Sequence, residues 1–167
     1  MRRLVLIIAA AAVAAFAGAA GPAAGAKKCK AGVHKFDGST KARTFCGPAS
    51  AKVTLLPGQS PVKFKPGECE IHKKYVTVNL GTIVLGPTNK KRPEYFGLTV
   101  GRTPAGGKPA PKDGTYDQDV VISFEHKNKG HALGNSSVTL THNRTRGTFQ
   151  GTPFGQQGAV TGSFRCK

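Results

Sequence analysis

The sequence predicts an all-β protein, an antiparallel β-sandwich of about nine or ten strands held by two disulfides. Apolar and polar residues alternate in short segments from Lys27 onward, and clusters of Gly, Pro and Asn separate these segments at intervals of roughly ten residues. No stretch has a helical period that would connect parallel strands. Because a sheet of this many strands usually folds over onto itself to cover its apolar face, a sandwich is favoured.

The first residues have the layout of a secretory signal peptide. Arg2 and Arg3 precede an apolar run that ends at about residue 20, and a segment of small residues follows. Ala24 and Ala26 satisfy the small-x-small pattern of signal peptidase. We therefore expect residues 1–26 to be removed and residues 27–167 to form a single β-sandwich domain. The alanine-rich leader is typical of bacteria.

The alternative for this segment is a retained membrane helix, because its apolar run approaches the ~20 residues that cross a bilayer. Alanine dominates the run and partitions weakly into lipid, which favours cleavage. A lipid anchor is not expected, since Cys29 follows two lysines and not a small residue. The expected product is secreted or extracytoplasmic and has no stable membrane anchor after cleavage.

Alternation defines the strands in order along the chain. In residues 75–80, for example, Val76, Val78 and Leu80 share one face and polar residues lie between them. The candidate segments, from which about nine or ten strands are expected, are residues 31–36, 41–46, 51–56, 62–65, 69–71, 75–80, 96–100, 120–124, 137–142, 146–150 and 159–166. The predicted turns between them contain Gly, Pro or Asn and lie at 56–61, 65–68, 86–93 and 127–130, with the longest connection at 101–114.

Four cysteines remain after cleavage, an even number that indicates two disulfides in an oxidising compartment. Three pairings are possible. In the last strand Cys166 is in step with apolar residues, and at the other end Cys29 is in step with Ala31. Both terminal cysteines are therefore expected to face inward, which predicts Cys29 paired with Cys166 and Cys46 paired with Cys69.

Positive charge is the strongest functional signal. The chain has 25 Lys and Arg residues against 8 Asp and Glu, a net charge of +17 that falls to about +15 without residues 1–26. If strands 82–85 through 146–150 form a meander, the turns at 90–92 and 127–129 emerge at the same end of the sheet. They form a candidate polyanion-binding patch of Lys90, Lys91, Arg92, Lys127 and Lys129. Arg144 and Arg146 are also placed near a turn, and Lys63 and Lys65 alternate with Phe64 and add charge to one sheet face.

Other constellations do not form a known catalytic or metal pattern. His126, His131 and His142 are the nearest histidines, but the first two are expected on opposite sides of a hairpin without a joining carboxylate or cysteine. The acidic segment at 113–119 does not follow the order of a calcium loop. No nucleophile elbow is present. We expect no metal, no cofactor and no catalytic residues.

The segment "SSVTLTHNRTRGTFQGTPFGQQGAVTGSFRC" resembles the closing part of small exported lipoprotein antigens of mycobacteria and related actinobacterial secreted proteins. Glycine-marked hairpins and a final strand that ends in cysteine carry the resemblance. It implies a disulfide-bonded β fold outside the cytoplasm without a defined biochemical activity. The lipid-modified cysteine of those antigens has no counterpart here.

These observations lead to one functional expectation and two alternatives. The expectation is an exported noncatalytic protein that binds an acidic polysaccharide or cell-wall polymer through a basic surface. Specific nucleic-acid recognition is not expected, because the chain has no Trp and no recognition motif. The alternatives are a ligand carrier that uses the sandwich interior or its loops, and a secreted hydrolase.

Overall fold

The computed structural model describes residues 29–102, 106–155 and 157–167, and these residues form twelve antiparallel strands in one sheet without a helix. The predicted all-β class is confirmed, with slightly more strands than expected. The strands are β1 (Gly32–Asp37), β2 (Thr40–Phe45), β3 (Ser50–Thr54), β4 (Val62–Phe64), β5 (Gly67–Ile71), β6 (Tyr75–Leu85), β7 (Tyr95–Gly101), β8 (Gly114–Tyr116), β9 (Val120–His126), β10 (Lys129–Thr141), β11 (Arg146–Pro153) and β12 (Val160–Arg165). The predicted signal peptide, residues 1–26, lies outside the described residues.

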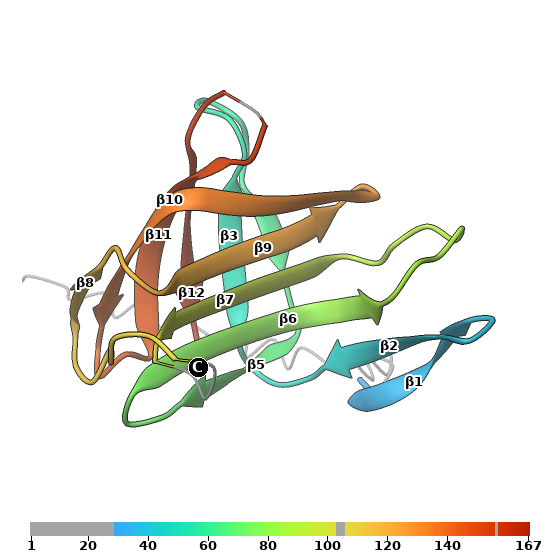
Figure 1. Ribbon diagram of the computed structural model, residues 1–167, viewed down its shortest axis with the longest axis horizontal. Coiled ribbons are helices and arrows are strands. Elements are labelled where there is room, and N and C mark those ends of the chain that lie inside the picture. The colour runs from blue at the N-terminus through green and yellow to red at the C-terminus, as the bar shows by residue number, and fades with distance from the viewer. Residues whose placement is uncertain (1–28, 103–105, 156) are drawn as a thin grey trace, which may run out of the picture.

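The sheet is folded over into two layers (Figure 1). Its strand order is β1-β2-β6-β7-β9-β10-β11-β12-β3-β4, with β5 paired to β6 and β8 paired to β10. In Figure 1, β3 and β12 cross behind β6, β7 and β9. The described residues contain no apolar helix of the length that a membrane span requires.

Strand β10 carries the sheet from one layer to the other. Its first residues pair with β9, whereas the residues from Leu133 onward pair with β11. The register with β11 shifts between Gly134 and Ser137, and Asn135 in this interval has a φ of 45°. Such a bulge bends a strand and increases its twist, so the two layers diverge from this point.

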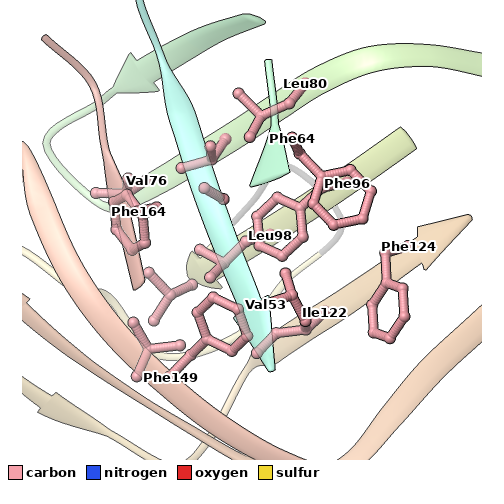
Figure 2. Packing of buried hydrophobic residues seen from close by; sticks show 14 of the residues in the cluster. Val53, Phe64, Val76, Leu80, Phe96, Leu98, Ile122, Phe124, Phe149 and Phe164 are labelled. Atoms are coloured by element: carbon pink, nitrogen blue, oxygen red, sulfur yellow. The ribbon is translucent and has the colours of Figure 1, made fainter. Parts of the chain in front are cut away.

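Apolar side chains from both layers fill the space between them (Figure 2). Phe64 of β4 lies with its ring centroid 5.8 Å from that of Phe96 in β7 and 6.3 Å from that of Phe124 in β9. Phe149 of β11 approaches Phe96 at 5.4 Å. Each such aromatic pair contributes about 0.5–1.5 kcal/mol beyond the burial of its surface, so these rings tie the two layers together.

Two disulfides are present, but the predicted pairing is wrong. Cys29 pairs with Cys46, and Cys69 pairs with Cys166. Parity along the strand predicts an inward Cys29, whereas β1 pairs only with β2 and most of its residues are exposed. Since Gly32 lies opposite Thr44 in this hairpin, continuation of the ladder brings Cys29 beside Cys46.

The other disulfide links the two layers. Cys166 follows β12 and is buried, as parity predicted, while Cys69 lies on β5 and packs against the core. Strand β5 pairs with β6 in one layer, and β12 pairs with β3 and β11 in the other. The covalent bond therefore joins the end of the chain to the opposite layer.

Three elements differ from the sequence-based expectation. Strand β10 begins at Lys129, eight residues before the predicted start at residue 137, because its first part pairs with β9. Strand β8 was not predicted, because its three residues follow directly on the Pro- and Gly-rich connection and are too few to show alternation. Strand β6 runs without a break through the predicted strands 75–80 and 82–85, because β2 pairs with its second half as β5 pairs with the first. A partner on each half carries the strand through Gly81, which separates the two predicted segments.

We expect the Cys69–Cys166 disulfide to stabilise the fold more than the Cys29–Cys46 disulfide does. On the chain-entropy estimate, a loop of 97 residues contributes about 5 kcal/mol and a loop of 17 residues about 3 kcal/mol. Urea unfolding of a Cys69→Ser/Cys166→Ser variant and a Cys29→Ser/Cys46→Ser variant measures the difference. Equal losses of unfolding free energy, or a Cys29–Cys166 link in non-reducing peptide maps, would contradict this assignment.

Candidate functional site

The two turns of the predicted patch do meet in space. The turn between β6 and β7 contacts the turn between β9 and β10, because the Arg92 backbone N–H donates to the Asn128 side-chain oxygen at 2.9 Å. These turns and the first residue of β10 hold all five residues of the predicted patch, which we call the loop end: Lys90, Lys91, Arg92, Lys127 and Lys129. The β6-β7-β9-β10 pairing therefore brings together the cations that sequence reasoning singled out.

Carboxylates compensate part of this charge. Arg92 forms an ion pair with Glu125 at 2.8 Å, and Lys90 approaches Asp37 at 3.3 Å. Hydrogen bonds from Thr88 and Lys90 hold the pKa of Asp37 below its ordinary value. Such pairing supports a structural role for two of the five cations, since it fixes the turn onto β9 and the β1–β2 hairpin.

A further carboxylate, that of Glu94, organises the neighbouring turn. One oxygen contacts His126 Nδ1 at 2.7 Å, and the other accepts the backbone N–H of Lys127 at 3.1 Å. The loop end therefore contains three acids beside its cations. Its positive field is weaker than the sequence alone suggests.

The opposite layer has a different charge distribution. The sequence contains no Asp or Glu between Asp37 and Glu68, and none after Glu125. Strands β3, β4, β10, β11 and β12 all fall within these acid-free segments. Every charged side chain on these strands is therefore basic.

Five cations of this layer line one open groove of about 600 Å³. We call them the basic face: Lys52, Lys63, Lys65, Arg146 and Arg165. All five are exposed, and among the described residues none of them takes part in an ion pair. No carboxylate is found among the residues that line the groove.

Strand register places these cations in direct like-charge pairs. Lys52 of β3 lies opposite Lys63 of β4, and Arg146 of β11 lies opposite Arg165 of β12. Opposed residues in an antiparallel pair have their Cβ atoms about 4.5–5.5 Å apart, and like charges in such pairs are destabilising. The free protein therefore carries electrostatic repulsion on this face that an anion would relieve.

Hydroxyl groups lie between and beside the cation pairs. Ser163 is opposite Lys52, and Ser50 is opposite Arg165. The Arg165 Nε–H donates to Ser50 Oγ at 3.1 Å, which leaves the remaining N–H groups of the guanidinium unused by this contact. The groove therefore offers charged and neutral hydrogen-bond donors on one surface.

Protection of a sheet edge explains only part of this arrangement. Lysines on edge strands discourage pairing with other chains, and β4 with Lys63 is an edge strand. Strands β11 and β12 are interior strands, each with a partner on both sides. Arg146 and Arg165 therefore need another explanation.

The remaining candidates form no comparable site. In the described part of the chain, no three His, Cys, Asp or Glu side chains are close enough to hold a metal ion. Asp113 accepts the backbone N–H groups of Asn143 and Arg144, so it fixes a turn. A second hollow of about 410 Å³ is lined by residues of the β1–β2 hairpin alone, including Val33 and Lys41.

Sequence reasoning found part of the basic face and missed the rest. Alternation around Phe64 placed Lys63 and Lys65 on one face, and Arg146 was assigned to a turn. Lys52 and Arg165 were not singled out. The signal that could have found them is the absence of acids from both segments combined with strand parity, which turns Lys52 and Arg165 outward.

Comparisons with protein-family models, with curated proteins and with solved structures found no match to this chain.

Salt should stabilise the free protein, because it screens the repulsion between cations of the basic face. Between about 0.01 M and 0.15 M salt the Debye length falls from about 30 Å to about 8 Å, which weakens repulsion between exposed cations. A face variant (Lys52→Gln, Lys63→Gln, Arg146→Gln, Arg165→Gln) should gain less stability over this range than wild type, by about 0.2–1 kcal/mol per pair. Urea unfolding at both salt concentrations measures this.

The matched control is a loop variant that loses the same four charges: Lys90→Gln, Lys91→Gln, Lys127→Gln and Lys129→Gln. Because it leaves both like-charge pairs in place, its response to salt should stay closer to that of wild type. If the two variants respond equally, net charge alone accounts for the effect and the cross-strand pairs do not.

A separate pH effect is expected from His131, whose ring stacks on Phe124 at 4.8 Å between centroids. Burial, and then the charges of Lys129 and His126, lower the pKa of His131 below its ordinary value. The unfolded chain therefore binds the proton more readily, so folding stability should fall as the pH drops below about 6.5 towards the folded pKa.

His131→Gln should reduce this loss, whereas His34→Gln, at an exposed position of β1, should retain it. Thermal unfolding between pH 7.5 and pH 5 compares the three proteins. A loss of stability in His131→Gln as large as that in wild type would rule out His131 as the responsible group.

Proposed function

We propose that this protein is an exported, noncatalytic binding protein whose basic face binds an acidic polymer. The observation that carries the proposal is the acid-free groove in which Lys52 opposes Lys63 and Arg146 opposes Arg165. Two like-charge pairs destabilise the free protein, and an anion placed between them removes that cost. If these cations served solubility alone, they could be spaced apart on the surface and would not repel each other.

The shape of the basic face supports a polymer more than a small ligand. The groove crosses four neighbouring strands, from β4 through β3 and β12 to β11, and is open to solvent. Neighbouring strands lie about 4.8 Å apart, so the cations form an extended strip. A polyanion that follows this strip releases its counterions, which gives an affinity that depends strongly on salt.

The covalent structure and the sequence both support export from the cytoplasm. Both disulfides join cysteines of the same chain, and no free cysteine is present in the described residues. Disulfides of this kind persist in oxidising compartments outside the cytoplasm. The signal-peptide pattern in residues 1–26 supports export, and the acidic polymers of a bacterial envelope are then within reach of the basic face.

The test compares the face variant with the loop variant on immobilised dextran sulfate, polyphosphate and polygalacturonate. Wild type should be retained at low salt and released as salt increases. The face variant should lose retention, and its plot of log affinity against log salt should be less steep by about one for each cation that contacts the polymer. The loop variant should behave like wild type.

Two outcomes would contradict the proposal. If the loop variant loses retention and the face variant keeps it, the binding site is the loop end. If neither variant nor wild type is retained on any of the three polymers at low salt, the protein does not bind acidic polymers.

A further inference from the structure

The basic face also limits the chemistry of the anion, an argument that rests on the proposed function. Arg146 and Arg165 lie directly opposite each other on interior strands. Each guanidinium carries five N–H donors in a planar fork, and Arg165 spends its Nε–H on Ser50. Two adjacent forks therefore present several parallel donors to whatever lies above them.

One hydroxyl adds to this supply. Ser50 flanks the arginine pair on one side and accepts from Arg165, so this contact does not use the proton of its own hydroxyl. Thr141 flanks the pair on the other side, where its hydroxyl donates to the Arg146 carbonyl oxygen at 3.5 Å. A carboxylate has two oxygens and pairs well with a single fork. A sulfate ester or a phosphate monoester has three terminal oxygens and can accept from both forks at once. The number of hydrogen-bond donors therefore suits a group with three free oxygens better than a carboxylate with two.

The distance between the two cation pairs sets a second condition on the ligand. The Lys52–Lys63 pair lies one row away from the Arg146–Arg165 pair, because Ser50 and Lys52 are two residues apart on β3 and Ser50 is opposite Arg165. Two residues along a strand span about 7 Å, and the two pairs also lie two strands apart across the sheet, which adds about 10 Å in the perpendicular direction. The two pairs are thus roughly 12 Å apart, and anions must recur along one chain to reach both.

Ring recognition plays no part in this surface. The aromatic residues that line the groove are Phe64 and Phe164, and both are buried, with 2% and 4% of their surface exposed. Sugar rings and nucleic-acid bases are commonly held by stacking on exposed aromatic rings. The basic face offers only charge and hydrogen bonds, so selection acts on the anionic groups of the ligand.

We propose that the ligand is a polymer that carries sulfate-ester or phosphate-monoester groups at intervals along one chain, with the Arg146–Arg165 pair holding one such group and the Lys52–Lys63 pair another. The two arginines act as a clamp that distinguishes these esters from carboxylates. The lysine pair supplies charge without that distinction, because an ammonium is a point charge.

Three forms of one polymer test this: dextran sulfate, dextran phosphate and carboxymethyl dextran at the same degree of substitution. They share a backbone and a spacing of anionic groups. The sulfate and carboxymethyl groups each carry a single charge, so their comparison isolates the anionic group, whereas a phosphate monoester carries a charge of about −1.5 to −2. Calorimetric titration should give at least about tenfold tighter binding to the sulfate or the phosphate form than to the carboxymethyl form, as expected when charge-assisted hydrogen bonds are gained. Whichever of the two binds more tightly identifies the ester.

An Arg146→Lys/Arg165→Lys variant is the matched control, because it keeps both charges and removes both forks. It should still bind all three polymers, and its preference for the esters should fall to less than about threefold, since a Lys ammonium cannot make bidentate contacts.

Equal affinity of wild type for the ester and carboxymethyl forms would overturn this inference and leave the proposed function standing. If the lysine variant still prefers the ester forms as strongly as wild type does, the two arginines do not cause the preference. Lack of binding to all three forms would instead refute the proposed function.

Discussion

The bend of β10 is the constraint on which the rest of the structure depends. One end of this strand pairs with β9 and the other with β11, so a single strand belongs to both layers of the folded sheet. The bulge between Gly134 and Ser137 lets the strand change direction without ending. Without that bend, the apolar faces of β6, β7 and β9 would have no opposing layer, and the aromatic residues between the layers would remain in water.

Because side chains alternate along a strand, the residues that face the core determine which residues face solvent. In β11 buried and exposed residues alternate without exception, so Phe149 faces the core while Arg146 and Thr148 face solvent. The same parity that builds the core therefore builds the basic face on the other side of the strands. Because the Cys69–Cys166 disulfide joins β12 to β5, the strand that carries Arg165 is also tied covalently to the opposite layer. The cations thus lie on a rigid support.

The charges are divided between the layers. Acids beside the loop end hold turns in place, as Glu125 does with Arg92 and Glu94 does with the Lys127 backbone. The β3-β4-β11-β12 part of the sheet has no acids and keeps its repulsion. An arrangement that costs stability without serving the core is typical of a surface that has a partner. This contrast between the two ends favours the basic face over the loop end as the binding surface.

The local sequence was sufficient to predict most of the strands and the cluster of cations at the loop end, but not the pairing of strands. Alternation predicted most strands and the inward direction of Cys166, and a meander of the strands between them predicted that the loops with Arg92 and Lys127 emerge at one end. It failed for Cys29, because parity along a strand does not reveal whether that strand has a layer above it. It also did not find the Arg146–Arg165 and Lys52–Lys63 pairs, since these depend on which strands are neighbours and in what register. The compensation of Lys90 by Asp37 was missed for the same reason.

The central claim is that the acid-free layer, and not the loop end, is where the polyanion lies. Amide chemical shifts of the ¹⁵N-labelled protein, followed during titration with dextran sulfate at low salt, test it residue by residue. We predict that shifts concentrate on Lys52, Lys63, Arg146 and Arg165 and their strand neighbours. Shifts confined to the turns around Lys91 and Lys127, with the basic face unchanged, would contradict it.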